Sequence, residues 1–200
     1  MTTQNTDIRQ HIIDTAKPIL LVKGFSAVGL SELLTAAQVP KGSFYHYFKS
    51  KELFGEALLN NYFEGYMLRL ENTLSVPGLS AAECLMRYWQ RWMDTQQCDT
   101  DIEHKCLVVK LGSEVSDLSE SMRLALRRGT TSIIARLTQC IEEGCTDGSL
   151  PKTLDPQMTA QILYSQWLGA TVQTKIRHDA NALETAMAMT LHMLNIPPTA

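Results

Sequence analysis

A cysteine with positively charged neighbours is the first candidate for chemistry in this sequence. Cys106 lies in HKCLVVK (residues 104–110), directly after His104 and Lys105 and four residues before Lys110. Nearby positive charge favours the thiolate, which is the form that oxidants and electrophiles attack. In a helix a residue at i+1 does not face the thiol, whereas a residue at i+4 does. Cys106 is therefore either a sensor thiol or a small buried hydrophobic residue, which is the usual role of an unpaired cysteine.

The residues around this cysteine do not form the set that catalysis requires. An enzyme needs a nucleophile, a base and an orienting group at convergent positions. Cys106 and His104 are two residues apart, hence on different helix faces, and no Ser-His-Asp or metal triad is evident in the sequence. A metal sensor using Cys98 with these two residues would match no standard zinc spacing. We therefore predict no enzymatic activity, no metal site and no cofactor.

A second stretch is suited to contacting DNA. In GLSELLTAAQVPKGSFYHYFKSK (residues 29–51), a short segment with helically spaced apolar residues ends near Gln38. Pro40 then opens a second segment, since proline in the first turn of a helix costs nothing where that N–H would be unpaired anyway. Two short helices joined by a tight connection form a helix-turn-helix motif, whose second helix can enter the DNA major groove.

The second segment separates aromatic core residues from polar residues. Phe44 and Phe48 lie one helical turn apart on one face, which favours a core position. Lysines can meet phosphates, while Ser and His offer hydrogen bonds to base edges. The residues predicted to contact or position DNA are Ser31, Lys41, Gly42, Ser43, Tyr45, His46, Tyr47, Lys49 and Lys51. Among these, the base-reading candidates are Lys41, Ser43 and His46, and the phosphate candidates are Tyr45, Tyr47 and the lysines.

The charge distribution agrees with an anionic partner at the N-terminal end. The 200-residue chain carries 18 basic and 21 acidic residues, a net charge of −3. Residues 1–50 hold five basic and three acidic side chains, a balance of +2. Residues 51–200 hold the other 13 basic and 18 acidic ones, a balance of −5. We therefore expect attraction to nucleic acid at the N-terminal end only.

Composition favours a cytoplasmic protein with a real core. Hydrophobic residues make up 44% of the chain, so disorder is not expected. No stretch approaches the roughly 20 apolar residues that a membrane span needs, and the start MTTQNTDIRQ has no signal-peptide core. Five cysteines are an odd number without zinc-site clustering. In a reducing compartment they are expected to be thiols rather than structural disulfides.

Helical periodicity runs along the whole chain, and no convincing strand appears. Apolar residues at spacings of three and four predict a helix over residues 7–22. Thr6 or Asp7 can cap its start, and Gly24 can supply the left-handed stop. Pro18 lies late in this helix and invites a kink. Further helices are predicted over residues 50–75, with Ser50 as N-cap, and over 80–96, 104–112, 119–144, 156–176 and 182–194.

The two C-terminal helices, residues 156–176 and 182–194, predict a dimer. Both are apolar over most of their circumference, and such a helix is buried on two sides. One side would be the protomer core and the other a twin helix pair in a symmetric dimer, with Gly169 and Ala170 allowing close approach. A central core helix in a monomer is the alternative for residues 156–176. Two recognition helices related by a twofold axis would read a palindrome with half-sites about 34–36 Å apart.

The run VPKGSFYHYFKSKELF (residues 39–54) resembles the signature of TetR-family repressors. That signature is a glycine-containing turn, an aromatic-rich recognition helix and a following Ser-Lys-Glu; a helical hairpin inside an unrelated all-α protein is the alternative. The resemblance implies an all-α homodimer with a three-helix helix-turn-helix DNA-binding domain over residues 1–52. It also implies a regulatory and dimerisation body over residues 53–200. Repression would follow from blocking promoter access at a palindromic operator, and a signal in the body would release DNA.

Two further stretches, residues 104–123 and 162–176, resemble electrophile- and bleach-sensing members of this family. This resemblance implies that Cys106 is the sensing cysteine, Lys175 its partner lysine and Cys98 a second cysteine. The implied chemistry is oxidation or alkylation of Cys106. A sulfenic acid there can condense with a nearby nitrogen to give a reversible S–N bond. A disulfide with Cys98 is a competing outcome if the two Cα atoms approach within roughly 7 Å.

A small apolar ligand bound without covalent chemistry is the alternative inducer. The body contains aromatic and Met side chains suited to a ligand pocket, but such residues at helical spacing are usually core. The candidate pocket residues are Trp89, Trp92, Met93, Met122, Tyr164 and Trp167. The operator and the physiological inducer do not follow from the sequence. No role follows for Cys84, Cys140 and Cys145 either.

Overall fold

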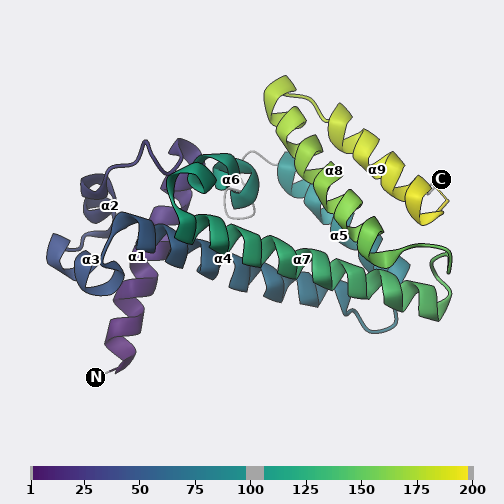
Figure 1. Ribbon diagram of the computed structural model, residues 1–200, viewed down its shortest axis with the longest axis horizontal. Coiled ribbons are helices and arrows are strands. Elements are labelled where there is room, and N and C mark those ends of the chain that lie inside the picture. The colour runs from purple at the N-terminus through teal and green to yellow at the C-terminus, as the bar shows by residue number, and fades with distance from the viewer. Residues whose placement is uncertain (1, 98–105, 198–200) are drawn as a thin grey trace. The chain divides into compact units, whose positions relative to one another are not determined.

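The computed structural model describes residues 2–97 and 106–197, with side chains for residues 8–96 and 106–197. All regular secondary structure in these residues is α-helical, as predicted (Figure 1). The helices are α1 (Thr2–Lys23), α2 (Leu30–Ala37), α3 (Lys41–Phe48), α4 (Lys51–Leu74), α5 (Ala81–Gln97), α6 (Leu107–Leu118), α7 (Glu120–Asp147), α8 (Pro156–Arg177) and α9 (Asn181–Leu194). None of these helices is both long and apolar enough to cross a membrane.

The chain divides into two compact units. The first unit comprises residues 1–64 and 101–129, and the second comprises residues 65–100 and 130–200. The first unit therefore contains α1, α2, α3 and α6, with the beginnings of α4 and α7. The second contains α5, α8 and α9, with the remainder of α4 and α7. Each unit has its own buried apolar core.

The first helix begins earlier than predicted. α1 starts at Thr2 instead of residue 7, so Thr6 and Asp7 lie inside the helix and are not its N-cap. Residues 2–6 are polar and carry no apolar periodicity, which is why the pattern missed them. Pro18 lies inside α1 without ending it. Gly24 follows the last residue with φ +87° and donates its N–H to the Leu20 carbonyl at 2.8 Å, which confirms the predicted left-handed stop.

Aromatic residues form the core beneath the helix-turn-helix. Phe44 and Phe54 are fully buried and Phe48 is 3% exposed. Their ring centroids lie 5.1–5.4 Å apart in tilted or edge-on arrangements, the geometry that aromatic pairs prefer. The expectation that Phe44 and Phe48 are core residues is confirmed, and this cluster joins α3 to the start of α4.

The core of the second unit is built around α8 and α9, which lie side by side (Figure 1). α8 begins with a side-chain cap, since Asp155 accepts a hydrogen bond from the Met158 N–H at 2.9 Å. It ends at His178 in the left-handed conformation. Leu163 and Trp167 on α8 are fully buried. α5 packs against α9 and completes this core.

Candidate DNA-binding interface and sensor region

The turn between α2 and α3 is closed by backbone hydrogen bonds. Gln38 adopts the left-handed conformation with φ 54°. Its N–H donates to the Thr35 carbonyl at 3.2 Å, and the Val39 N–H donates to the Leu34 carbonyl at 3.1 Å. This 6→1 and 5→2 pair is the Schellman arrangement that ends helices. Pro40 is the N-cap of α3 rather than its first residue, and its φ of −65° serves both positions.

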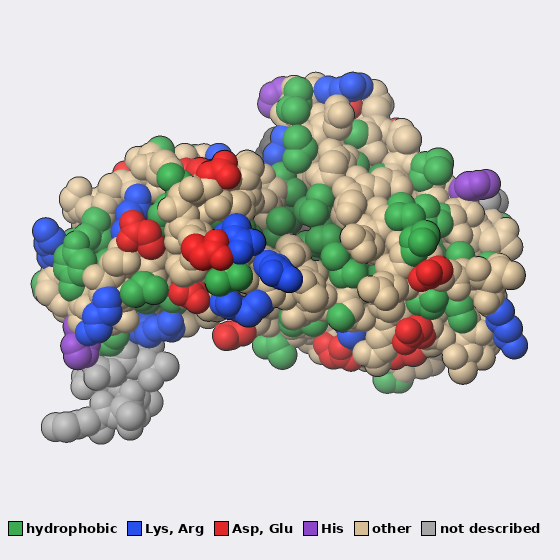
Figure 2. All heavy atoms as spheres, viewed as in Figure 1, with side chains coloured by type: hydrophobic (Ala, Val, Ile, Leu, Met, Phe, Trp, Pro, Cys, Tyr) green, Lys and Arg blue, Asp and Glu red, His purple; other side chains and the backbone are tan. Residues whose placement is uncertain are grey.

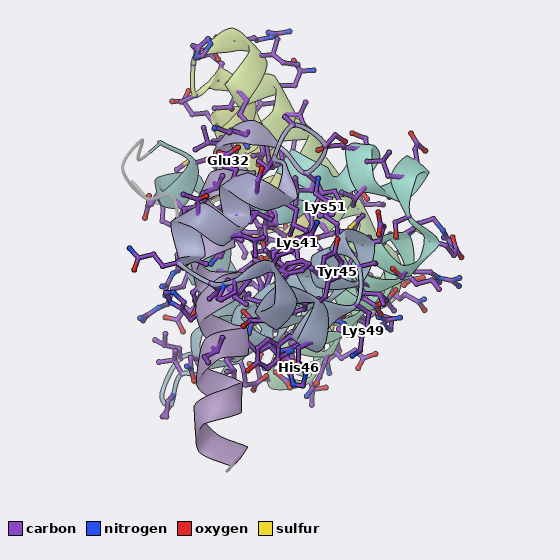
Figure 3. The ribbon with its side chains drawn as sticks, turned by 90° about the vertical axis from the view of Figure 1, so that its left-hand side faces the viewer. Glu32, Lys41, Tyr45, His46, Lys49 and Lys51 are labelled. Carbon is purple, nitrogen blue, oxygen red and sulfur yellow. The ribbon has the colours of Figure 1, made fainter. Side chains whose placement is uncertain are left out.

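The face of α3 opposite its phenylalanines carries most of the predicted DNA-contacting residues. Lys41, Gly42, Tyr45, His46 and Lys49 are exposed. Figure 3 shows the labelled side chains of this set on α3 and at its C-terminal end. A Cβ added at Gly42 would meet no atom within 4 Å, so a DNA backbone could approach closely there. Of the remaining candidates, Ser31 is exposed on α2, while Ser43, Tyr47 and Lys51 are half-buried.

Lys49 connects α3 to α4 in a strained conformation. Its φ is 61° and its ψ is −39°, and the Ser50 N–H donates to the Phe48 carbonyl across it at 2.6 Å. A γ-turn with positive φ at its central residue is rare and strained. The Lys49 ammonium donates to the His46 carbonyl at 3.2 Å. Ser50 then caps α4 as predicted, accepting the Leu53 N–H on its hydroxyl at 3.1 Å.

Lys51 differs from the other lysines of this region because it bonds within the first unit. Its Nζ donates to the Phe25 carbonyl at 2.8 Å. It also lies 4.6 Å from the centroid of the Phe25 ring, within the range of a cation–π contact. These contacts fasten the start of α4 to the segment after α1. A DNA contact by Lys51 remains a prediction.

Cys106 lies at the beginning of α6. It is the N-cap residue, with φ −71° and ψ 110°, and it is 5% exposed. Its carbonyl accepts the Lys110 N–H at 3.2 Å. The Lys110 ammonium, the cation expected near the thiol, donates to the Val22 carbonyl at the end of α1 at 2.9 Å. A chemical change at the thiol would therefore act directly on the N-terminal end of α6.

The predicted partners of Cys106 are Lys175 and Cys98. Lys175 is exposed on α8 and belongs to the second unit, whereas Cys106 belongs to the first. Cys98, together with His104 and Lys105, lies outside the described residues. Both pairings stay predictions. Within the described part of the chain, no group of three or more His, Cys, Asp or Glu side chains could hold a metal ion.

Two other cysteines are buried in the second unit. Cys84 and Cys140 are 2% and 0% exposed. Burial raises the pKa of Cys140 to about 12, although the nearby Arg136 guanidinium acts in the opposite direction. The Cys140 thiol lies 3.7 Å from the Ala81 carbonyl and can donate to it. Cys140 therefore behaves as a packed neutral thiol at neutral pH.

Four of the six candidate pocket residues form an aromatic cluster in the second unit. Trp89 stacks on Trp167 at 5.0 Å with an interplanar angle of 15°, and Trp92 lies 5.9 Å from both Trp89 and Tyr164. The indole N–H of Trp92 donates to the Thr171 hydroxyl at 2.9 Å. The rings fill space against one another, as core residues do.

The other two pocket candidates, Met93 and Met122, are not part of the aromatic cluster. Met93 is half-buried on α5. Met122 belongs to the first unit, where its sulfur would lie 2.3 Å from a Cβ added at Gly55. Only glycine at position 55 allows this close packing of α7 on α4.

The Trp89 indole N–H is buried without a hydrogen-bond partner among the described residues.

Glu114 is a residue to which the sequence assigned no role. Its carboxylate accepts hydrogen bonds from the backbone N–H groups of Phe25 and Ser26 at 3.1 and 2.6 Å. These partners are 89 and 88 residues away in the sequence, so no local pattern could have indicated them.

Comparison with known proteins identifies the family. Residues 12–58 match the family described as "Bacterial regulatory proteins, tetR family". Residues 81–190 match the family described as "Tetracyclin repressor-like, C-terminal domain". The chain is 42% identical over 193 residues to the HTH-type transcriptional repressor NemR of Escherichia coli (strain K12), covering 96% of this chain and 95% of NemR. It is 29% identical to the HTH-type transcriptional repressor DhaR of Mycobacterium sp. (strain GP1), covering 97% and 95% of the two chains.

Solved structures give the same result. The crystal structure of E. coli NemR in its reduced form superposes with a TM-score of 0.87 at 42% identity, covering 97% of this chain and 98% of that one. The two family matches fall on the helix-turn-helix and on the C-terminal helices, in the order in which the structure presents them. The chain belongs to the TetR family of DNA-binding transcriptional repressors.

Proposed function

We propose that this protein binds a palindromic operator as a homodimer and leaves it when Cys106 is oxidised or alkylated. In this proposal residues 1–52 are the DNA-binding domain and residues 53–200 the regulatory and dimerisation domain. The observation that carries the proposal is the position of Cys106 at the N-cap of α6 in a chain 42% identical to NemR. The inducer would be a small electrophile or oxidant.

The DNA-binding part is supported by the outward face of α3. Lys41, His46 and Lys49 place hydrogen-bond donors and positive charge on one exposed surface. Base contacts would come from Lys41, Ser43 and His46, and phosphate contacts from Lys49 and the two tyrosines. Phe44 and Phe48 hold this face in place because they are buried beneath it.

The dimer is supported by an apolar stripe along α8. The exposed residues of this stripe recur at spacings of three and four, which places them on one helix face. They are the apolar Met158, Ile162, Val172 and Ile176, with the small residues Ser165 and Gly169 between them. Ile176 is 71% exposed and Met158 is 59% exposed in the single chain, and Figure 2 shows hydrophobic side chains on the surface over α8 and α9. A Cβ added at Gly169 would meet no atom within 4 Å, so a second copy of α8 could pack closely there.

The proposed chemistry at Cys106 balances without a cofactor. The thiolate attacks hypochlorous acid, giving a sulfenic acid and chloride, so sulfur is oxidised and chlorine is reduced. Condensation of the sulfenic acid with an amine such as that of Lys175 then forms an S–N bond and releases water. With Cys98 the same intermediate would give a disulfide and water. With an electrophile such as N-ethylmaleimide, the thiolate instead adds to one carbon of the double bond and the other carbon takes up a proton from water, so no group leaves.

A ligand-induced repressor is the second candidate, and one observation favours it. The buried Trp89 N–H lacks a partner among the described residues, and a buried unsatisfied donor calls for an explanation. A small apolar compound with a hydrogen-bond acceptor would satisfy it. Such a repressor would respond to an unreactive compound and would tolerate Cys106→Ser.

The experiment that separates these candidates starts from an operator selected by binding from a random DNA pool. Operator affinity is measured for the wild type and Cys106→Ser, with and without hypochlorite or N-ethylmaleimide. Loss of binding in the wild type alone supports the thiol switch. Equal loss in both removes Cys106 from the mechanism. Retention in both contradicts covalent sensing and leaves the ligand-induced repressor.

A further inference from the structure

A carboxylate on α6 holds the backbone that joins α1 to α2. Glu114 accepts the Ser26 N–H at 2.6 Å and the Phe25 N–H at 3.1 Å. The two amides are consecutive, and each meets a different oxygen of the same carboxylate. Hydrogen bonds to an ionised acceptor are roughly twice as strong as neutral ones. The segment held in this way leads directly into the helix-turn-helix.

Two lysines bond to carbonyl groups of this segment and of the last turn of α1. Lys110, one turn earlier than the carboxylate on α6, donates from its Nζ to the Val22 carbonyl at 2.9 Å. Lys51 at the start of α4 donates to the Phe25 carbonyl at 2.8 Å. The last carbonyls of a helix have no intrahelical partner, so Lys110 satisfies a group that would otherwise need water. α6 thus holds the end of α1 with one anion and one cation.

We name the contacts of Glu114 and Lys110 with residues 22–26 the α6 clasp, and it fits closely. At Gly24, where φ is +87°, an added Cβ would lie 3.0 Å from the carboxylate. Partial burial raises the pKa of Glu114, but hydrogen bonding by the Ser26 side chain and by the Ser26 and Phe25 amides, together with the charge of Lys110, outweighs this effect, and its net pKa lies below the usual value. The carboxylate is therefore ionised at neutral pH, as the clasp requires.

We propose that the α6 clasp transmits a chemical change at Cys106 to the DNA-binding helices, an inference that rests on the sensor role proposed above. Cys106 is the N-cap of α6, and Glu114 follows eight residues later on the same helix, about 12 Å along its axis. An oxygen or alkyl group added to a side chain that is 5% exposed requires a shift of α6 or its neighbours. Hydrogen bonds of these lengths weaken steeply once distance and angle depart from the optimum.

In this account the clasp is closed while Cys106 is reduced and the protein binds its operator, and modification of Cys106 opens it. Releasing the segment after α1 removes the contacts by which α6 holds the end of α1, so that α1, α2 and α3 can change orientation relative to α6. Glu114 and Lys110 are positioning residues in this account and do not contact DNA or the oxidant.

Operator affinity before and after modification tests this coupling. Glu114→Gln keeps the size of the side chain but removes its charge, and Asp117→Asn makes the same change at an exposed position of α6. We expect Glu114→Gln to weaken operator binding of the reduced protein about tenfold, and Asp117→Asn to change it less than about twofold. Modification by N-ethylmaleimide should then lower the operator affinity of Glu114→Gln by a much smaller factor than it lowers that of the wild type. Equal factors in the two proteins would overturn the proposal.

Hydrogen exchange of the Phe25 and Ser26 amides would not respond to modification of Cys106 if Glu114 had a purely structural role. Modification of Cys106 in the wild type should speed exchange of the Phe25 and Ser26 amides, measured by NMR. A Lys110→Met variant, which removes the other half of the clasp, should show the same loss of coupling if Glu114→Gln proves too unstable to study. Unchanged exchange at both amides after complete modification would contradict the inference.

The two readouts distinguish failure of the inference from failure of the sensor role. If the modified wild type releases its operator while both amides stay protected, the sensor role stands and the clasp is not its route. If the amides lose protection while the operator stays bound, the clasp responds to Cys106 but the proposed function fails. If neither changes, both are wrong.

Discussion

At the scale of single residues, Lys49 combines a cationic side chain with a strained backbone. Its φ of 61° and ψ of −39° place it at the centre of a γ-turn directly after α3. Strained residues persist where the surrounding structure determines them, often at functional sites. Here the buried Phe48 on one side and the Ser50 cap on the other fix the chain path. The turn ends the recognition helix and exposes a lysine at its C-terminal end.

Two substitutions at Lys49 separate its charge from its backbone. Lys49→Gly should raise the free energy of unfolding by about 1 kcal/mol, because glycine adopts positive φ without strain, whereas Lys49→Ala keeps the strain. Both variants would lose the proposed phosphate contact, so both should bind all operator sequences more weakly and lower the salt slope by about one. Chemical denaturation and salt-dependent anisotropy titrations measure the two effects. An unchanged salt slope in both variants would show that Lys49 does not contact a phosphate.

The cysteines are expected to differ in reactivity because burial acts on them differently. With a pKa raised to about 12, Cys140 is ionised in only about one molecule in ten thousand at pH 8. We predict that N-ethylmaleimide at pH 8 labels Cys140 last among Cys106, Cys140 and Cys145 in the folded protein. Mass spectrometry after timed quenching measures the order, and labelling of the denatured chain is the control. Early labelling of Cys140 would contradict the packed neutral thiol described here.

At the scale of elements, the apolar stripe of α8 makes a prediction about assembly. Ile162 lies in the middle of this stripe and is 43% exposed. Ile162→Asp would bury a charge in a symmetric interface twice, and we expect it to weaken dimerisation at least about a hundredfold. Leu68→Asp, at an exposed position of α4 that is 69% accessible, is the matched control. Sedimentation velocity across a dilution series should show monomers for the first variant only, and dimers for both would exclude the stripe as the interface.

Elements with local signals were the ones that could be predicted from the sequence. Gly24 and Ser50 end and begin helices through their own backbone or side chain, and Phe44 with Phe48 marks the buried face of α3. Such signals depend on residues within one helical turn. They therefore gave the helix-turn-helix and the all-α class, together with the core face of the recognition helix.

Contacts between distant elements could not be predicted in this way. Lys51 has the sequence context of a DNA-contacting lysine, yet its Nζ bonds to the Phe25 carbonyl 26 residues away. Glu114 reads as one more acidic residue on a helix, and its partners are 88 and 89 residues distant. The early start of α1 was missed for a different reason, because polar residues form a helix without any apolar period to reveal it.

At the scale of the whole molecule, carboxylates bound to cations or amides couple stability to pH. Hydrogen bonds from the nearly buried Arg136 and from Ser75 hold the pKa of Glu71 below its usual value. A carboxyl group with a lowered pKa in the folded state stabilises the fold above its unfolded pKa, and this contribution is lost as the pH falls through the folded value. Glu71 and Glu114 should therefore contribute to acid unfolding at pH values below the ordinary pKa of a glutamate carboxyl group.

Glu71→Gln tests this contribution. The variant leaves the guanidinium of Arg136, which is 8% exposed, with a longer carboxylate contact to Glu143 at 3.9 Å. Because the Glu71 side chain is 54% exposed, solvent screens the lost pair, and we expect a loss of about 1 kcal/mol in unfolding free energy at pH 7. The loss should shrink as the pH falls through the folded-state pKa of Glu71, because the wild-type carboxylate then becomes protonated. Urea titrations at several pH values measure it, with the exposed Glu142→Gln as control. A loss that is independent of pH would show that the charge of Glu71 is not the stabilising feature.

The central claim is that the chemical state of Cys106 sets operator occupancy. The most direct measurement follows both quantities in one sample: operator-bound protein is titrated with hypochlorite while anisotropy reports DNA release and mass spectrometry reports the oxidation of each cysteine. We predict that the released fraction rises in proportion to oxidised Cys106, with Cys140 still reduced at full release. Release that precedes Cys106 oxidation, or full oxidation of Cys106 with the operator still bound, would contradict the account.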